Sequence, residues 1–419
     1  MEQQPETYPR HTMSLVQEAL EDTPVVVVQG ARQVGKSTLV QLATDRMDTR
    51  FVTMDDPNSR SLATEDPQFF VEQAGEGALI VDEAQRAPDL ILPIKASVDR
   101  VRRPGRFLLT GSADLLQVKG VGDSLAGRAE TVELMTLSQG EINFRQNPED
   151  FVSWVLRGAE SPGDFFELDP ETVVTGGYPE VLLRSPRRRG RWFTSYTERL
   201  ADHDAKDLQS GGFSDHMSGL LRLLAAQGQS ELVKAKDART LGISETTFDA
   251  YLRLAQVMRL VTSTPPWRRA PRSRLSKRPK VSLTDTGLAA HLAGFTSSMA
   301  STVGGREFYG ALIEQFVVLE LKRQRTWSDQ LFEIFHYRDH DGPEVDVLLE
   351  LSDGRLIAIE VKSARSVNER SWSTLKQFRN QMKDREVLGI VLHTGTQVAH
   401  LNDWLHVLPI TSLWEHPID

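Results

Sequence analysis

The sequence predicts an α/β protein in three parts: a parallel-sheet module over residues 1–140, a mainly helical middle over residues 141–300, and a second α/β domain over residues 301–419. Three observations support this prediction. An apolar strand runs directly into a glycine-rich loop and a helix near the N-terminus. Further apolar runs alternate with helical segments, which indicates parallel strands joined by crossover helices. The middle contains the spacing of two helices joined by a tight turn.

The stretch Val25–Thr38 reads VVVVQGARQVGKST and contains the full phosphate-binding pattern of glycine, four residues, and Gly-Lys-Ser. The valines predict a strand that is buried on both faces. The glycines leave room for backbone N–H groups around phosphate oxygens, the lysine can reach the β and γ phosphates, and the serine hydroxyl can ligate Mg²⁺. An ordinary glycine turn is the alternative. We predict that ATP and Mg²⁺ bind to this loop, through Gly30, Ala31, Arg32, Gln33, Val34, Gly35, Lys36, Ser37 and Thr38.

The second half of a nucleotide-hydrolysing site follows later in the module. Phe51–Met54 reads as a second strand, and Ala78–Val81 as a third strand that ends in Asp82 and Glu83. At about 45 residues after a phosphate loop, two acids at a strand end predict that Asp82 binds the Mg²⁺ shell and that Glu83 activates the attacking water. An acidic cap on a structural strand is the alternative.

Ser112 is a further catalytic candidate. Phe107–Thr110 reads as a fourth strand, and the serine just beyond it can hydrogen-bond the γ-phosphate or the attacking water; a Gly-Ser turn is an equal alternative. A helix is expected at residues 115–126 and a fifth strand at Thr131–Met135, with Arg128 between them.

Residues 230–283 have the pattern of a winged helix. A short helix, a turn at Gly242 and an N-cap at Ser244 lead into a second helix, and two short strands flank a basic loop. The loop has no acid, and we expect Trp267 to be exposed within it. DNA is the expected partner, although a bland loop or a protein-docking wing is as probable. The predicted DNA contacts are Arg268, Arg269, Arg272, Arg274, Lys277 and Arg278.

A second basic run, at residues 184–191, has two interpretations. It can contact phosphate backbone, with Trp192 and Tyr196 stacking on bases. It can also be the solvated face of a helix whose aromatic residues are buried, and this interpretation is favoured.

The last part carries a candidate nuclease site. Asp346 is followed, about fourteen residues later, by an acid-any-lysine tripeptide, which is the spacing of restriction-type nucleases. We predict that Asp346 and Glu360 share a second divalent metal, with Glu314 completing the cluster and Lys362 stabilising charge on the scissile phosphate. Alternatively, the fold is a docking platform in which the acids pair with Lys362 and Arg338.

Histidines add no metal site to this prediction. His336, His340 and His393 are not spaced as a metal-binding set, so solvated or core positions are expected.

The stretches GARQVGKSTL, LIVDEAQRAP, LLTGSADLL and SLAGR resemble the predicted AAA-type ATPases of bacteria and archaea. Those proteins carry a C-terminal domain of unknown function that is related in fold to restriction nucleases, and GGYPEV, LTDTGL, GPEVDVLL and IEVKS resemble the same family. The resemblance implies that the Phe107 strand lies between the first strand and the Ala78 strand. It also implies that Arg128 is an arginine finger toward a neighbouring subunit, with a surface ion pair as the alternative. Monomer and homo-oligomer both remain open.

Composition limits the remaining possibilities. There are no cysteines, so disulfides, thiolate metal sites and cysteine nucleophiles are excluded. The net charge of −9 argues against nucleic-acid binding by the whole surface. No secretory signal or membrane-spanning run is visible, so we expect a cytoplasmic protein with no membrane partner.

The function predicted from the sequence is ATP hydrolysis coupled to action on DNA. An ATP-licensed nuclease is one alternative, and a nucleotide switch that binds protein partners without cleaving nucleic acid is another.

Overall fold

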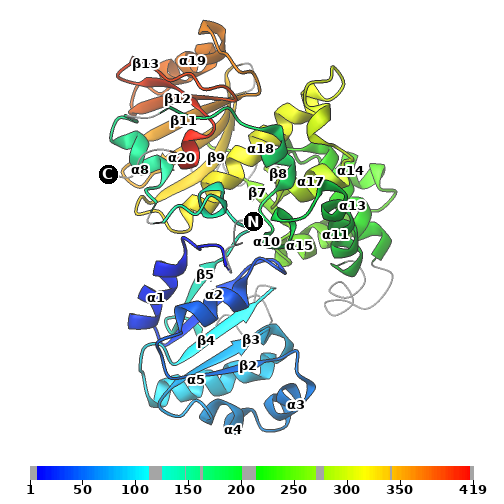
Figure 1. The fold of residues 1–419 in the computed structure, drawn as a ribbon, viewed down its shortest axis with the longest axis vertical. Coiled ribbons are helices and arrows are strands. Elements are labelled where there is room, and N and C mark those ends of the chain that lie inside the picture. Colours follow the sequence, from blue (N-terminus) through cyan, green and yellow to red (C-terminus); the bar gives the residue numbers. More distant parts are fainter. Residues whose placement is uncertain are drawn as a thin grey trace, which may run out of the picture. The chain divides into compact units, whose positions relative to one another are not determined.

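The computed structural model describes residues 7–112, 125–146, 148–160, 164–200, 214–269, 278–339 and 342–415 (Figure 1). The chain forms two compact units, of which the first comprises Met1–Leu137 and Val257–Arg259 and the second the remainder. The boundary predicted near residue 140 therefore lies close to the observed one, and the boundary predicted near residue 300 lies inside the second unit.

The first unit is built on a five-stranded parallel sheet with strand order β2-β3-β4-β1-β5. Because β4 lies between β1 and β3, the strand order implied by the family resemblance is confirmed. The predicted helix at residues 115–126 falls largely outside the described residues. The strands are β1 (Val25–Gln29), β2 (Thr49–Thr53), β3 (Ala78–Asp82), β4 (Phe107–Gly111) and β5 (Ala129–Glu133).

Helices cover both faces of this sheet, as parallel strands require. Alternate β1 residues, Val25 and Val27, pack with Phe70, Ile94 and Val98 in one apolar cluster under α3 (Pro57–Glu65), α4 (Pro67–Glu72) and α5 (Ile91–Arg100). The helices α1 (Met13–Asp22) and α2 (Lys36–Ala43) contact each other and the central strands (Figure 1, dark blue). Asp56 caps α3 by accepting a hydrogen bond from the Ser59 N–H.

The second unit begins with helices arranged around a small antiparallel sheet of order β6-β8-β7. The predicted two-helix turn is present, and the Ser244 hydroxyl accepts a hydrogen bond from the Thr247 N–H at 3.1 Å. The strands are β6 (Ser230–Glu231), β7 (Val261–Thr264) and β8 (Lys280–Leu283). The helices are α7 (Gln139–Ile142), α8 (Phe151–Leu156), α9 (Pro170–Thr175), α10 (Pro179–Leu182), α11 (Pro186–Arg199), α13 (Ser214–Gln227), α14 (Lys234–Thr240), α15 (Glu245–Val257) and α17 (Thr286–Leu292).

A six-stranded mixed sheet of order β13-β14-β12-β11-β10-β9 completes the second unit (Figure 1, yellow to red). Neighbours β9, β10 and β11 are antiparallel, and β11, β12 and β14 are parallel. The strands are β9 (Phe332–Arg338), β10 (Glu344–Leu351), β11 (Leu356–Lys362), β12 (Val387–His393), β13 (Ala399–Asn402) and β14 (Leu405–Pro409). The helices are α18 (Arg306–Arg325), α19 (Ser373–Gln381) and α20 (Ser412–Glu415).

The prediction that Trp267 is exposed is wrong. Its side chain is only 1% exposed and packs in the apolar cluster of this sheet with Tyr337 and Phe378. Its backbone N–H donates to the His336 carbonyl at 2.7 Å. Burial of the large indole outweighs the local prolines, so the segment after β7 lies on the six-stranded sheet.

Candidate functional site

The phosphate loop follows β1 at the carboxyl edge of the first unit's sheet, where ligands bind in open parallel sheets. A Cβ on Gly30 would lie 2.1 Å from the Leu134 carbonyl oxygen, so only glycine fits. Gln33 and Gly35 have φ of 63° and 97°, and this alternation folds the loop into a concave turn of backbone N–H groups. The Lys36 ammonium is buried and donates to the Gly30 and Ala31 carbonyls at 3.1 and 3.0 Å. The loop is thereby held in a phosphate-receiving shape.

Ser37 and Asp82, the predicted magnesium ligands, are in direct contact. The Ser37 hydroxyl donates to Asp82 Oδ1 at 2.8 Å, and Thr110 Oγ1 donates to the same oxygen at 2.6 Å. Asp82 ends β3 and Thr110 lies in β4, so neighbouring strand ends converge on one carboxylate. These hard oxygen donors fit Mg²⁺, which prefers one or two protein oxygens together with phosphate and water.

Glu83 and Ser112, the predicted base and sensor, also lie together. Ser112 Oγ is 3.4 Å from Glu83 Oε2, and the Gln85 amide donates both to Glu83 and, at 3.0 Å, to Ser112. Glu83 has φ of 55°, a left-handed conformation that is costly for a non-glycine residue. Its N–H donates to Thr110 Oγ1 at 3.2 Å, which holds that conformation in place.

Arg128 lies at the other end of the same sheet. Its carbonyl accepts from the Val25 N–H at the start of β1, whereas the phosphate loop follows the end of that strand. The guanidinium binds Asp99 at 2.6 Å, which is the surface ion pair given as the alternative. The side chain is therefore remote from its own loop, and a role in a neighbouring subunit stays a prediction.

Four residues at this edge were not predicted from the sequence. Thr110 and Gln85 were accessible to inference, because each is a polar residue beside a predicted strand end. Arg10 and Arg259 carry no sequence signal, since both lie far from the motifs along the chain. Arg10 donates to the Val34 and Met135 carbonyls at 2.6 and 2.7 Å.

The predicted nuclease residues are brought together in the second unit, and two of the acids pair with lysines. Lys280 Nζ lies 2.6 Å from Glu314 and 3.7 Å from Glu344, and Lys362 Nζ lies 2.5 Å from Glu360. Asp346 accepts from the Val361 N–H at 2.8 Å. Among the described residues, no group of three His, Cys, Asp or Glu side chains is placed to hold a metal ion.

The pKa values of these acids reflect their burial. Burial, together with the charge of Asp346, raises the pKa of Glu360 to about 7 and that of Glu314 to about 8. Burial also raises the pKa of Asp346. Arg338, expected to pair with these acids, instead lies within 3.7 Å of Glu344.

The histidines of this part are core residues where they are described. His336 and His393 are 2% and 0% exposed, and burial lowers the pKa of both side chains. His340 lies outside the described residues.

Two of the predicted DNA contacts are bonded to the protein itself. Arg268 donates to the Arg338 carbonyl at 3.0 Å, and Arg269 pairs with Asp384 at 3.0 Å, so both help to hold their segment on the six-stranded sheet. Arg278 is exposed. Arg272, Arg274 and Lys277 lie outside the described residues.

The basic run at residues 184–191 forms a helix face with buried aromatic partners, as favoured. Arg189 is buried against Glu171, and Tyr196 is buried and stacked on Trp192 with ring centroids 4.9 Å apart. The Tyr196 ring is therefore not available to stack on nucleic-acid bases.

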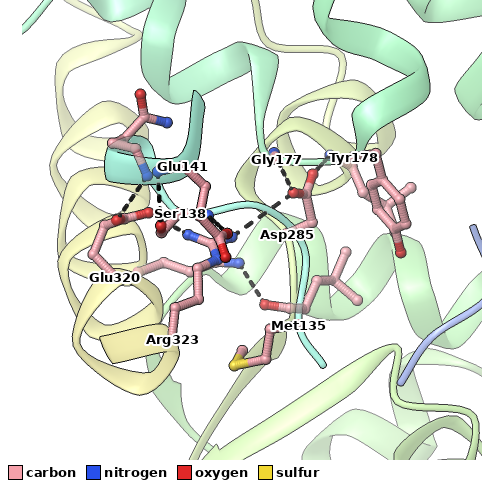
Figure 2. Close-up of polar contacts among 12 residues, drawn as sticks. Met135, Ser138, Glu141, Gly177, Tyr178, Asp285, Glu320 and Arg323 are labelled. Carbon is pink, nitrogen blue, oxygen red and sulfur yellow. Dashed lines mark hydrogen bonds and ion pairs between the residues drawn. The ribbon is translucent and has the colours of Figure 1, made fainter. Parts of the chain in front are cut away.

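The GGYPEV and LTDTGL stretches serve packing. Gly177 N–H donates to buried Asp285 at 2.7 Å, and a Cβ on Gly176 would lie 2.3 Å from the same carboxylate. Figure 2 shows Asp285, at the N-cap of α17, and Glu320 and Arg323, from α18, pointing toward one another. Glu320 also accepts from the Gln139 N–H at 3.0 Å. This buried ionic network joins segments distant in sequence, and removing one partner would leave an uncompensated charge.

Comparison with known proteins agrees with the geometry of the first unit. Residues 22–143 match a family described as an AAA domain. Residues 168–299 and 309–413 match families described as domains of unknown function, DUF8612 and DUF4143. An uncharacterized protein of Mycobacterium tuberculosis is 27% identical over 402 residues, which cover 96% of this chain and 83% of that protein; an uncharacterized protein of Mycobacterium bovis gives the same values.

Among solved structures, a Walker-type ATPase of Pyrococcus abyssi is 14% identical, and the alignment covers 68% of this chain and 96% of that chain with a TM-score of 0.41. An AMPPCP-bound DnaA from Aquifex aeolicus is 17% identical over 58% of this chain and 86% of that chain, with a TM-score of 0.27. Both TM-scores are too low to support a functional argument.

The parallel sheet, the phosphate loop and the match of residues 22–143 to the AAA-domain family support an AAA-type P-loop ATPase module in the first unit. The chain is similar to proteins of Mycobacterium tuberculosis and Mycobacterium bovis that are described as uncharacterized, and its second unit matches two families described as domains of unknown function. No helix in the described part of the chain is both long and apolar enough to span a membrane.

Proposed function

We propose that this protein hydrolyses ATP at the loop edge of the first sheet and uses the nucleotide cycle to act on DNA. The supporting observation is the contact of Ser37 with Asp82 at 2.8 Å, with Glu83 and Ser112 on the adjoining strand ends. A hydroxyl, a carboxylate and a candidate base therefore lie beside one phosphate loop, and this is the set of groups that phosphoryl transfer to water requires.

Each side chain takes a separate role in this proposal. Lys36 exchanges its loop carbonyls for β- and γ-phosphate oxygens when nucleotide enters. Ser37 and Asp82 would hold Mg²⁺, which supplies charge neutralisation on the phosphates. Glu83 orients and deprotonates water, and Ser112 and Gln85 fix its carboxylate or bind the γ-phosphate.

DNA is supported as the target by the two-helix turn and its cations. A groove of about 590 Å³ lies between α15, the start of α14 and the β7–β8 sheet. Lys234, Arg253 and Arg278 line it, together with Glu245 and Asp249. Lys234 pairs with Asp249, so the two arginines outnumber the remaining acid and leave a basic surface.

Steady-state ATP turnover with and without duplex DNA tests this proposal. We expect DNA to stimulate turnover, and Arg253→Ala with Arg278→Ala to weaken DNA binding and to flatten its salt dependence by about one to two units of slope. Arg355→Ala is the matched control, because Arg355 lies in the turn between β10 and β11 and pairs with Asp353 at 2.8 Å. An unchanged slope would contradict DNA contact at this groove.

A metal-dependent nuclease is the second candidate, and one observation favours it. Glu360 is 7% exposed, and no described residue forms a hydrogen bond with its Oε2, which is costly for a buried carboxylate unless a cation completes it. The ion pairs of Lys280 and Lys362 count against this candidate, because a second divalent metal would have to displace them. The test is nicking of supercoiled DNA with Mg²⁺ or Mn²⁺, compared with Asp346→Ala and Lys362→Ala.

Nicking that both substitutions abolish would establish the nuclease. If neither DNA-stimulated turnover nor nicking is observed, the remaining candidate is a nucleotide switch that binds a protein partner.

A further inference from the structure

Arg10 lies outside the segment that matches the AAA domain, which begins at residue 22, yet it contacts the phosphate loop. One guanidinium nitrogen donates to the Val34 carbonyl at 2.6 Å and the other to the Met135 carbonyl at 2.7 Å. Its own carbonyl accepts from the Met13 N–H at 3.0 Å, at the first residue of α1. The side chain thus joins three separate segments of the first unit.

The bond to Val34 fixes the direction of the next backbone N–H. In a trans peptide the carbonyl and the following N–H point in opposite directions, and the described residues include no cis peptide bond. Because the Val34 carbonyl points at Arg10, the Gly35 N–H points away from the guanidinium. Gly35 has φ of 97° and is the N-cap of α2, where free N–H groups bind anions.

Without Arg10, the peptide group between Val34 and Gly35 would be free to rotate. Glycine at position 35 accepts several backbone conformations, so the sequence itself does not fix the peptide. Arg10 removes that freedom with a charge-assisted hydrogen bond, which is stronger than a bond between neutral groups. The guanidinium also lies beside Gly35, because a Cβ at that position would lie 3.6 Å from Arg10 Nη1.

We propose that Arg10 is a positioning residue for nucleotide binding: it orients the Gly35 N–H toward the phosphates and ties the loop to the chain that leaves β5 at Met135. This inference rests on the proposed ATP hydrolysis and extends the site beyond the AAA-domain match. Arg10 acts before chemistry, so its effect falls on binding of any nucleotide with a β-phosphate, ATP and ADP alike.

The test compares nucleotide affinity in Arg10→Ala, Arg10→Lys and the parent protein by calorimetry. We expect Arg10→Ala to weaken ATP and ADP binding about 10-fold each, which is about 1.4 kcal/mol, while kcat at saturating ATP changes less than 3-fold. Arg10→Lys, which keeps the charge but loses the fork geometry, should fall between the two. It also provides a folded variant if the alanine protein is unstable.

The matched control is Arg103→Ala. Arg103 likewise donates to a backbone carbonyl, that of Gly77 at 2.7 Å, but Gly77 immediately precedes β3 at the end of the sheet away from the loop. Equal nucleotide affinities in the Arg10 and parent proteins would overturn the inference, as would an equal loss in Arg103→Ala. A parent protein that binds no nucleotide would instead contradict the proposed function.

Discussion

The guanidinium of Arg259 binds the carboxylate of Glu133 at 3.0 Å, although the two residues are 126 positions apart in the sequence. A second guanidinium nitrogen donates to Gln29 Oε1 at 3.0 Å. Gln29 and Glu133 end the neighbouring strands β1 and β5, and Gly30 of the phosphate loop follows directly. Arg259 therefore adds a residue from the turn between α15 and β7 to the ATPase unit.

Substitution of Arg259 separates its side-chain and backbone effects. Arg259 has φ of 58°, a conformation in which alanine is strained and glycine is not. We expect Arg259→Ala to lower the unfolding free energy by about 1–2 kcal/mol, and Arg259→Gly to lower it by about 1 kcal/mol less. Chemical denaturation measures both. Equal losses would show that the backbone carries no strain at this position.

Glu83→Gln tests the assignment of the base. The amide keeps the shape and the contacts to Gln85 and Ser112, but it cannot accept a proton from water. ATP binding should stay nearly intact while kcat falls 10²-fold or more, about 2.7 kcal/mol of barrier. Lys36→Ala, by contrast, should weaken binding as well. Turnover of Glu83→Gln at the parent rate would show that another group activates water.

The nucleotide site could be predicted from sequence because its chemistry lies at strand ends. Val25–Val28 and Ala78–Val81 are continuous apolar runs, so the polar residues after them must lie at one sheet edge. Arg10 and Arg259 could not be predicted in this way. Their partners are backbone carbonyls and residues far away in the chain, and no local pattern specifies such contacts.

The contacts of the second unit were harder to predict from the sequence for the same reason. Lys280 belongs by sequence to the basic segment, yet it is 5% exposed and paired with Glu314, which belongs by sequence to a predicted metal cluster. Trp267 likewise joins the six-stranded sheet from another element. Both contacts depend on how elements pack, which helical or strand spacing does not reveal.

We predict that Arg128 acts as an arginine finger in the nucleotide site of a neighbouring subunit. The Arg128 side chain in its ion pair with Asp99 is 27% exposed, so breaking this pair should change the stability of the folded chain little. Mixing Arg128→Ala with Lys36→Ala subunits decides the role, because a shared site regains activity when an intact loop meets an intact finger. Asp99→Ala is the control, since it breaks the same pair and keeps the arginine. If mixing restores no activity and light scattering shows a monomer, the ion pair with Asp99 is the remaining role of Arg128.

The raised pKa values of Glu314 and Glu360 predict that the stability of the fold falls as pH rises. The pKa of Glu360 is raised to about 7 and that of Glu314 to about 8, from ordinary values of 4.5. Because the folded protein holds these protons more tightly than the unfolded chain, their contribution to stability is complete below pH 4.5. It is lost as pH rises through about 7 to 8. Burial dominates the pairing with Lys362 and Lys280 in setting this direction.

Glu360→Gln should therefore reduce the loss of unfolding free energy between about pH 5 and pH 8, because the neutral amide resembles the protonated acid and titrates no proton. Denaturation at several pH values measures this slope. Glu369→Gln is the control, since Glu369 is an exposed glutamate whose pKa is lowered by its hydrogen bond with Lys376. The carboxylates titrate as a group, so the double variant with Glu314→Gln should flatten the slope further. An unchanged slope in the double variant would mean that folding does not raise the pKa values of Glu314 and Glu360.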